Sequence, residues 1–148
     1  MDMESKPFWQ TKLSLYPSLK HDLECDVAII GAGIAGLSTA FMLTLSGKNV
    51  VIIDDGMVAG GQTKRTTGHL SSLLNDRYYN LEKCFGTNGI KIATKAHLSA
   101  IDFIQNLVSK YNIDCDFQSL DGYLFNPPKE DVSVLEKEYK SAKKLELD

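Results

Sequence analysis

Residues 26–55 carry the pattern that most constrains the fold of this chain. The run "DVAIIGAGIAGLSTAFMLTLSGKNVVIIDD" contains two short apolar segments, rich in β-branched residues, on either side of a glycine-containing segment. Each apolar segment is typical of a strand that is covered on both faces. Between them, apolar residues recur at helical spacing, and Gly47 is placed to end that helix. This order predicts a βαβ unit with two parallel strands.

The glycines of this unit, Gly31, Gly33 and Gly36, fit the pattern G-x-G-x-x-G. Taken alone the hexapeptide would indicate no more than a turn. Inside a βαβ unit, the first glycine makes the turn, the second lets the backbone approach a pyrophosphate, and the third lets helix and strand pack closely. Free N–H groups at the helix N-terminus favour the diphosphate. Asp54, at the end of the second strand, is placed to accept hydrogen bonds from ribose, which predicts a dinucleotide site and disfavours NADP.

The rest of the chain divides into an arm, a loop and a helical part. Residues 1–24 lack any period and are interpreted as an extended arm, and the Gly- and Thr-rich residues 56–74 as a loop. Residues 75–86 predict a short helix with Asn75 or Asp76 as its N-cap, and residues 87–111 predict a longer one.

Two further elements are expected near the C-terminal end. The pair Asp121-Gly122 predicts the turn of a β-hairpin, and residues 131–148 predict an amphipathic helix. On the longer helix that precedes them, His97 falls on the apolar face, where a histidine of the core is expected.

The composition and charge of the chain exclude several classes of function. A net charge of −3 argues against nucleic-acid binding, which requires a concentrated basic face. The uncharged run 27–47 contains four glycines and lies between acidic residues, so we expect no membrane span. Three widely separated cysteines, without any C-x-x-C, indicate reduced thiols and no metal site, and the polar N-terminus lacks a secretion signal. A cytoplasmic protein is expected.

Three quoted segments carry a resemblance to a known family. The run "DVAIIGAGIAGLSTAFMLTLSGKNVVIIDDG", followed by "GGQTKRTTGHLS" and "DRYYNLEKCFG", resembles the N-terminal part of FAD-dependent oxidoreductases of the D-amino-acid oxidase and glycine oxidase superfamily. The likeness is greatest to the subgroup whose longer members carry a Rieske iron–sulfur domain, and it extends from about Phe8 to the end.

The resemblance implies an α/β fold, with residues 25–148 as a partial, Rossmann-like FAD-binding domain. Within it, residues 25–55 would be the dinucleotide-binding unit, 56–74 a flavin and phosphate loop, and 75–148 helices and a hairpin leading toward a substrate domain. The chain would be the first third of a longer enzyme. Whether these 148 residues alone have activity stays open. Close pairs of Cys and His ligands are absent from the sequence, so we expect no iron–sulfur site.

The resemblance also assigns cofactor-binding residues. Asp54 would bind the adenosine ribose, and Asp55 would lie next to the adenine. The FAD pyrophosphate would be held by the glycine segment, namely Gly31, Gly33, Ile34, Ala35 and Gly36. The loop would supply residues beside the phosphates and the flavin, namely Gly61, Thr63, Arg65, Thr66 and Thr67. His69 would either contact the flavin or cap the following helix. Arg65 stands where some relatives attach FAD covalently through a histidine, which implies FAD held non-covalently.

The expected function is therefore that of the N-terminal FAD-binding portion of a flavin-dependent oxidoreductase. The resemblance implies oxidation of a C–H next to an amine, in a small amine or amino acid, by hydride transfer to the flavin. The sequence identifies neither the electron acceptor nor a catalytic residue, because no nucleophile and base pair or coupled carboxylates can be proposed from spacing. Two alternatives remain, an NAD-linked dehydrogenase domain and a non-catalytic nucleotide-binding remnant.

Overall fold

The computed structural model describes residues 15–73, 76–129 and 131–147 of the chain. They divide between two compact units, one up to His69 and one from Leu70 onward. The first part of the expected arm and the expected N-cap Asn75 lie outside the described residues.

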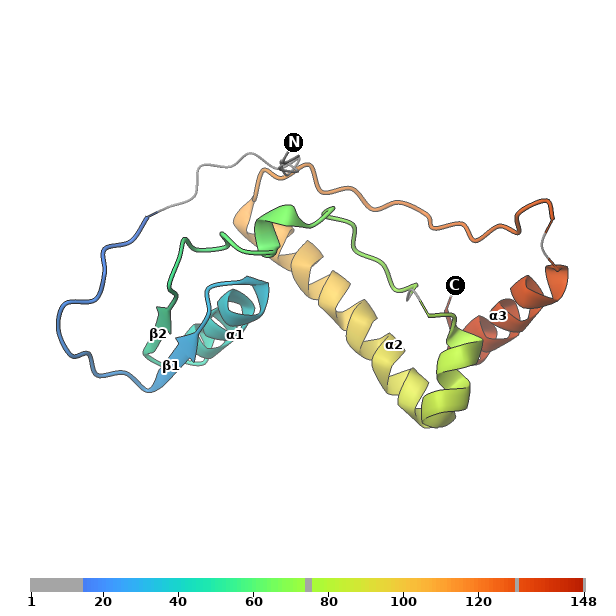
Figure 1. Ribbon diagram of the computed structural model, residues 1–148, viewed down its shortest axis with the longest axis horizontal. Coiled ribbons are helices and arrows are strands. Elements are labelled where there is room, and N and C mark those ends of the chain that lie inside the picture. Colours follow the sequence, from blue (N-terminus) through green and yellow to red (C-terminus); the bar gives the residue numbers. More distant parts are fainter. Residues whose placement is uncertain (1–14, 74–75, 130, 148) are drawn as a thin grey trace, which may run out of the picture. The chain divides into compact units, whose positions relative to one another are not determined.

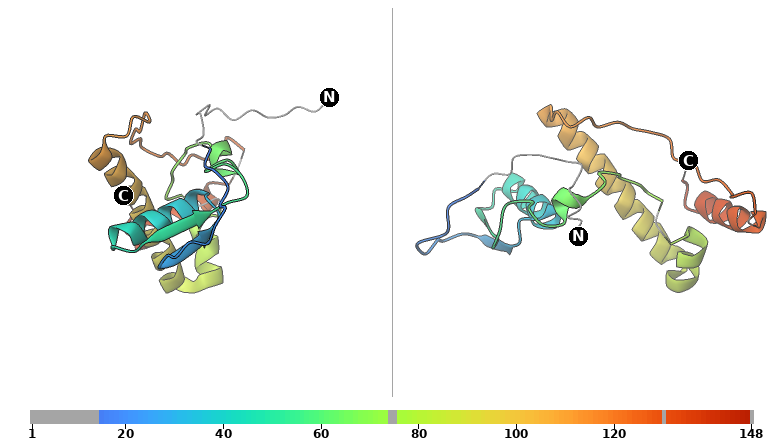
Figure 2. Two further views of the ribbon diagram at one scale, coloured as in Figure 1. Left: turned by 90° about the vertical axis from the view of Figure 1, so that its left-hand side faces the viewer. Right: turned by 45° about the horizontal axis from the view of Figure 1, so that its top comes forward.

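The first unit contains the predicted βαβ arrangement (Figure 1). Strand β1 (Val27–Ile30) leads into helix α1 (Ile34–Leu45), and strand β2 (Val50–Ile53) follows. The two strands pair in parallel, from Val27 opposite Val50 to Ile30 opposite Ile53 (Figure 2). Ala40 of α1 and Ala32 of the connecting turn are buried, so the core of this unit lies between the helix and the sheet.

The expectation that both strand faces are covered is wrong for the described residues. Burial alternates along β1, and the side chain of Ile30 is 81% exposed. The reason is that, within this unit, α1 packs against one face of the two-stranded sheet and no further helix of the unit covers the second face. The β-branched composition that suggested two covered faces thus leaves apolar side chains exposed on one face of this unit.

The second unit is built from two helices. Helix α2 (Tyr78–Tyr111) is interrupted at Gly86, which has a φ of 67° and a ψ of 170°, and the helix bends sharply there (Figure 2). This break separates the two helices predicted on either side of residue 86. Asn112 ends α2 in the left-handed conformation, as residues at a helix C-terminus often do. Helix α3 (Val132–Lys144) confirms the predicted last helix and packs against α2.

The expected hairpin at Asp121-Gly122 is not formed. Residues 113–127 contain no strand, and Gly122 lacks the positive φ that the predicted tight turn requires. Leu120, Tyr123 and Phe125 are 77–82% exposed, so the segment has no apolar surface to pack against. A two-stranded hairpin is marginal without such support.

Two local expectations on α2 are also wrong. The N-cap is Arg77 rather than Asp76, and Arg77 makes no side-chain capping bond. His97 is exposed rather than part of the core, because no described element of this unit covers the helix at that position. Within the described ranges, no helix combines the length and the apolar character that crossing a bilayer requires.

Candidate functional site: the glycine turn and its facing acids

The turn between β1 and α1 depends on glycine at two of its positions. Gly31 has a φ of +102°, a conformation that residues with a Cβ rarely adopt. A Cβ added to Gly36 would run into the carbonyl oxygen of Gly31, so the first turn of α1 can pack this closely on the strand only with glycine there. The sequence therefore brings the N-terminus of α1 directly against the carboxyl end of β1.

Gly33 differs from these two glycines. Its φ of −81° and ψ of −176° are extended values that any residue adopts, and an added Cβ would meet only the Thr63 hydroxyl, at 3.4 Å. The backbone therefore does not require glycine at this position. A missing side chain at Gly33 instead leaves open space in front of the helix N-terminus.

Asp54 joins the end of β2 to the glycine turn. Its Oδ2 atom accepts from the backbone N–H of Ala32 at 2.6 Å, and its Oδ1 atom accepts from the N–H of Gly56 at 2.8 Å. The N–H of Ala32, followed by that of Gly56, lowers the pKa of the Asp54 carboxyl below its ordinary value of 3.8. Asp54 is thus a carboxylate at neutral pH, and each oxygen keeps a further lone pair for a ligand.

The loop after β2 is fastened to the same turn. The N–H of Ala59 donates to the carbonyl of Ala32 at 2.9 Å, and the N–H of Ile34 donates to the Thr63 hydroxyl at 3.1 Å. Ala59 adopts a positive φ of 56°, and a Cβ on Gly60 would lie 2.7 Å from the Met57 carbonyl oxygen. The loop therefore folds back tightly and lays its glycines beside the turn.

These contacts enclose a cavity of about 470 Å³. Of the predicted site residues it brings together Gly33, Asp54, Asp55, Gly61 and Thr63, and it also includes five that were not predicted, Ala32, Gly56, Met57, Gly60 and Gln62. The pair Gly60-Gly61 was a sequence signal that could have identified part of this set. No pattern in the sequence predicts the positive φ of Ala59, which brings the loop to the turn.

The remaining predicted residues do not line the cavity. Gly31, Ile34, Ala35 and Gly36 form its backbone support, and the N–H groups of Ala35 and Gly36 have no acceptor among the described residues.

The predicted residues Arg65, Thr66, Thr67 and His69 are exposed and lie outside the cavity lining. Arg65 ends the short 3₁₀-helix η1 (Thr63–Arg65). The hydroxyl groups of Thr66 and Thr67 accept from the N–H groups of Gly68 and His69, respectively. The first N–H groups of α2 donate to Glu138.

The cavity combines two chemically different kinds of group. Its lining residues Ala32 and Gly33 lead directly into the N-terminus of a 12-residue helix, which carries about half a positive charge and has free N–H groups. Asp54 and Asp55 line the same cavity. Such a combination can hold a ligand that has a diphosphate at one point and hydroxyl groups at another. The absence of a Cβ on Gly33 provides room for the diphosphate, so the residues present fit a dinucleotide.

Comparison with known proteins gives matches among FAD-dependent oxidoreductases. The family profile of the FAD dependent oxidoreductases, DAO, matches residues 26–148. The Bacillus subtilis protein YhfW, whose name describes a Rieske 2Fe-2S iron-sulfur protein, is 34% identical over 143 residues, which are 95% of this chain and 28% of that protein. Gamma-glutamylputrescine oxidoreductase of Escherichia coli is 26% identical over 107 residues, or 72% of this chain and 25% of the relative.

A third relative, the Haemophilus influenzae protein OrdL, named as an oxidoreductase, is 30% identical over 103 residues, or 70% of this chain and 24% of the relative. The chain thus spans about a quarter of the length of the curated relatives it matches. No solved structure matches it. These findings confirm the resemblance drawn from the three quoted segments.

Proposed function

Because the chain belongs to the family of FAD-dependent oxidoreductases, we propose that the cavity beside the glycine turn binds the adenosine diphosphate part of FAD. The observation that carries the proposal is that the turn leading into the N-terminus of α1 and two acids line one cavity, in which Gly33 has no side chain. The family match favours FAD over the NAD-linked alternative.

Each kind of group at the cavity has its own role in this proposal. The free N–H groups of Ala35 and Gly36 donate to the diphosphate, and the Thr63 hydroxyl, already bound to the N–H of Ile34, extends that group of donors. Asp54 accepts from ribose hydroxyls while its two backbone bonds hold the carboxylate in place. Asp55 lies toward the adenine. FAD, when bound, supplies the group that takes a hydride from a substrate C–H.

The loop residues outside the cavity lining are proposed for the distal part of the cofactor. Arg65 ends η1, and Thr66 and Thr67 follow it directly. Together they offer a cation and two hydroxyl groups for the phosphates and the flavin. His69 is proposed to contact the flavin. Arg65 cannot form the covalent bond to flavin that a histidine forms in some relatives, so FAD is held non-covalently.

The wider function follows from the family. We propose that residues 25–148 are the N-terminal FAD-binding portion of an enzyme that oxidises a C–H next to an amine in a small molecule. Its relative gamma-glutamylputrescine oxidoreductase is named for an amine-containing substrate. A cytoplasmic location is proposed from the three cysteines, which are all free thiols.

The test is equilibrium binding of FAD and of NAD to the purified chain, followed by acid precipitation. We expect FAD to bind more tightly than NAD, and the flavin to stay in the supernatant after precipitation. Asp54→Ala should weaken FAD binding roughly ten- to hundredfold, and Asp102→Ala, an exposed acid of α2, should leave it unchanged. Tighter binding of NAD, or yellow protein in the pellet, would contradict the proposal. Reduction of bound flavin by an amine would exclude the non-catalytic alternative.

A further inference from the structure

A second hollow lies between α2 and α3, within the second unit. It has a volume of about 370 Å³, and its lining includes four lysines, Lys83, Lys137, Lys140 and Lys144. Glu82 is the one acid among its lining residues. We name this hollow the lysine groove. It shares no residue with the cavity beside the glycine turn and plays no part in the proposed binding of FAD.

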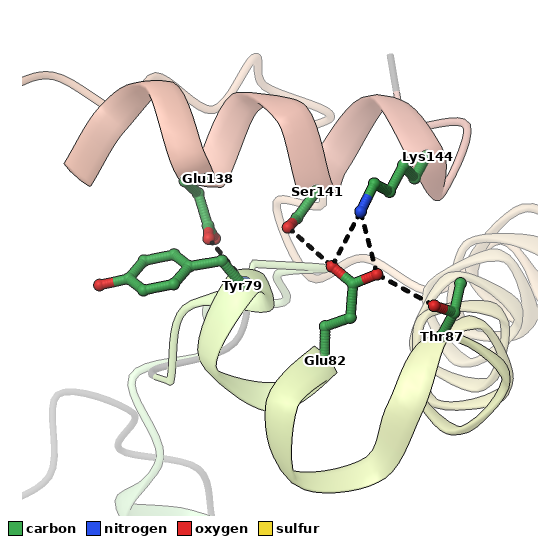
Figure 3. Close-up of polar contacts among 6 residues, drawn as sticks. All are labelled: Tyr79, Glu82, Thr87, Glu138, Ser141 and Lys144. Atoms are coloured by element: carbon green, nitrogen blue, oxygen red, sulfur yellow. Dashed lines mark hydrogen bonds and ion pairs between the residues drawn. The ribbon is translucent and has the colours of Figure 1, made fainter. Parts of the chain in front are cut away.

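Specific polar contacts hold the two walls of the lysine groove together (Figure 3). Glu138 of α3, only 5% exposed, accepts from the backbone N–H groups of Tyr78 at 2.9 Å and Tyr79 at 3.2 Å. Ser141, also 5% exposed, donates from its hydroxyl to Glu82 at 3.1 Å. Because buried groups make these bonds, the groove is formed before any ligand arrives.

The positive charge of the lysine groove is only partly balanced. Lys144 pairs with Glu82 at 3.2 Å, and this is the one ion pair within 4 Å in the part of the chain that the structure describes. The Glu82 carboxylate also accepts from Thr87 at 3.0 Å, so Glu82 is fully engaged (Figure 3). Asp131 interacts with Lys137 through charge at longer range. Four ammonium groups against the carboxylates of Glu82 and Glu138 leave the groove with a net positive charge.

The spacing of these lysines opposes helix stability. Lys137, Lys140 and Lys144 follow one another at i, i+3 and i+7, which places them on one face of α3. Like charges at such spacings destabilise a helix, although a cation in the last turn is favourable for the helix dipole. On α2, the ammonium group of Lys83 lies 5.1 Å from the centroid of the Tyr79 ring, which holds this lysine at the groove. An external anion would relieve the repulsion on both walls.

The arrangement of the charges selects the kind of anion. Residues 137–144 cover about 10.5 Å of helix axis at 1.5 Å per residue, so the three lysines of α3 leave the helix at successive positions along the groove. A single phosphate is shorter than this span, and each lysine is a separate point charge rather than a bidentate donor. An extended peptide advances about 3.3 Å per residue and presents carboxylates along its length. We propose that the lysine groove docks an acidic peptide segment of a partner protein.

The test is the fluorescence anisotropy of a labelled oligoglutamate peptide titrated with the full chain at low ionic strength. The double variant Lys137→Glu/Lys140→Glu should weaken binding at least about tenfold. The matched control Lys91→Glu/Lys95→Glu changes two exposed lysines of α2 outside the groove, and it should retain wild-type affinity. Raising the ionic strength to 0.15 M, where the Debye length falls to about 8 Å, should weaken binding by the wild type.

Folding of the variants is checked by circular dichroism, and Lys137→Gln/Lys140→Gln provides a milder change that should weaken binding in the same direction. The proposal is overturned if the wild type does not bind the peptide, or if the control pair loses as much affinity as the groove pair. It is equally overturned if inorganic tripolyphosphate binds more tightly than the peptide, because the groove would then be a phosphate site.

Discussion

Replacement of Gly33 separates the cofactor site from the fold more cleanly than any other single change in the chain. The φ of −81° and ψ of −176° at Gly33 are accessible to alanine, and the new Cβ would meet only the Thr63 hydroxyl, at an ordinary contact distance of 3.4 Å. A glycine replaced by alanine at a compatible position stabilises a protein by about 0.4–1 kcal/mol, because the unfolded chain loses freedom. Gly33→Ala should therefore fold at least as well as the wild type.

The same methyl group should weaken FAD binding. It would occupy the space through which the diphosphate approaches the N-terminus of α1, and overpacking of this kind costs about 1–3 kcal/mol. That cost corresponds to a roughly 5- to 140-fold weaker affinity for Gly33→Ala. The branched side chain of Gly33→Val should abolish detectable binding while the extended backbone is kept, since valine also adopts these angles.

The assay combines thermal unfolding without ligand and equilibrium titration with FAD. For the first unit, a gain of 0.4–1 kcal/mol corresponds to a rise in Tm of roughly 2–8 °C. Gly36→Ala is the contrasting variant, because its Cβ would run into the Gly31 carbonyl oxygen, and it should lower the Tm before any ligand is added. Wild-type FAD affinity in Gly33→Ala, or a loss of Tm as large as that of Gly36→Ala, would refute this reasoning.

Three further predictions concern groups with defined partners. The two backbone bonds that lower the pKa of Asp54 stabilise its carboxylate, so this contribution to stability is present above pH 3.8 and is lost as the pH falls through the lowered pKa. Acid unfolding of Asp54→Asn should lack this pH-dependent loss of stability. An acid titration unchanged from the wild type would contradict the prediction. Glu138→Ala leaves the N–H groups of Tyr78 and Tyr79 without their acceptor, and it should destabilise the second unit by about 2–4 kcal/mol in denaturant unfolding. The control Glu136→Ala, at an exposed position of the same helix, should cost less than about 0.5 kcal/mol. Burial raises the pKa of Tyr78, so neutral tyrosine stabilises the fold below pH 10.0, and this contribution is lost as the pH rises through the raised pKa. Tyr78→Phe removes the bond from the tyrosine hydroxyl to the Ser72 carbonyl and should cost about 0.5–1.5 kcal/mol of unfolding free energy. Alkaline titration of this variant should lack the transition.

Elements set by local pattern were predictable from the sequence. The βαβ unit, the break at Gly86, the end of the long helix at Tyr111 and the last helix all depend on periodicity or on a residue with an unusual backbone conformation. The acid at Asp54 was predictable as well, because its place after the second strand follows from the order of elements. These features arise within a few turns of chain, where side-chain spacing and backbone preference act directly.

Features set by distant parts of the chain were not predictable. The first N–H groups of α2 bind Glu138, which lies 60 residues from Tyr78, so a search for a neighbouring capping residue selected Asp76 wrongly. The hairpin predicted at Asp121-Gly122 does not form, because a pair of turn-forming residues does not provide the packing surface that strands require. His97 followed the apolar period of its helix, but burial depends on a covering element, which helical periodicity alone cannot supply.

Amide NMR spectra of the chain titrated with FAD determine whether FAD binds at the N-terminus of α1 beside Asp54. This measurement detects weak as well as tight binding, up to dissociation constants of about 1 mM. We predict saturable shifts of the amide signals of Gly33, Ala35 and Gly36, and their loss in Gly33→Val. Unchanged signals at these three residues under saturating FAD, or shifts confined to α2 and α3, would contradict the claim.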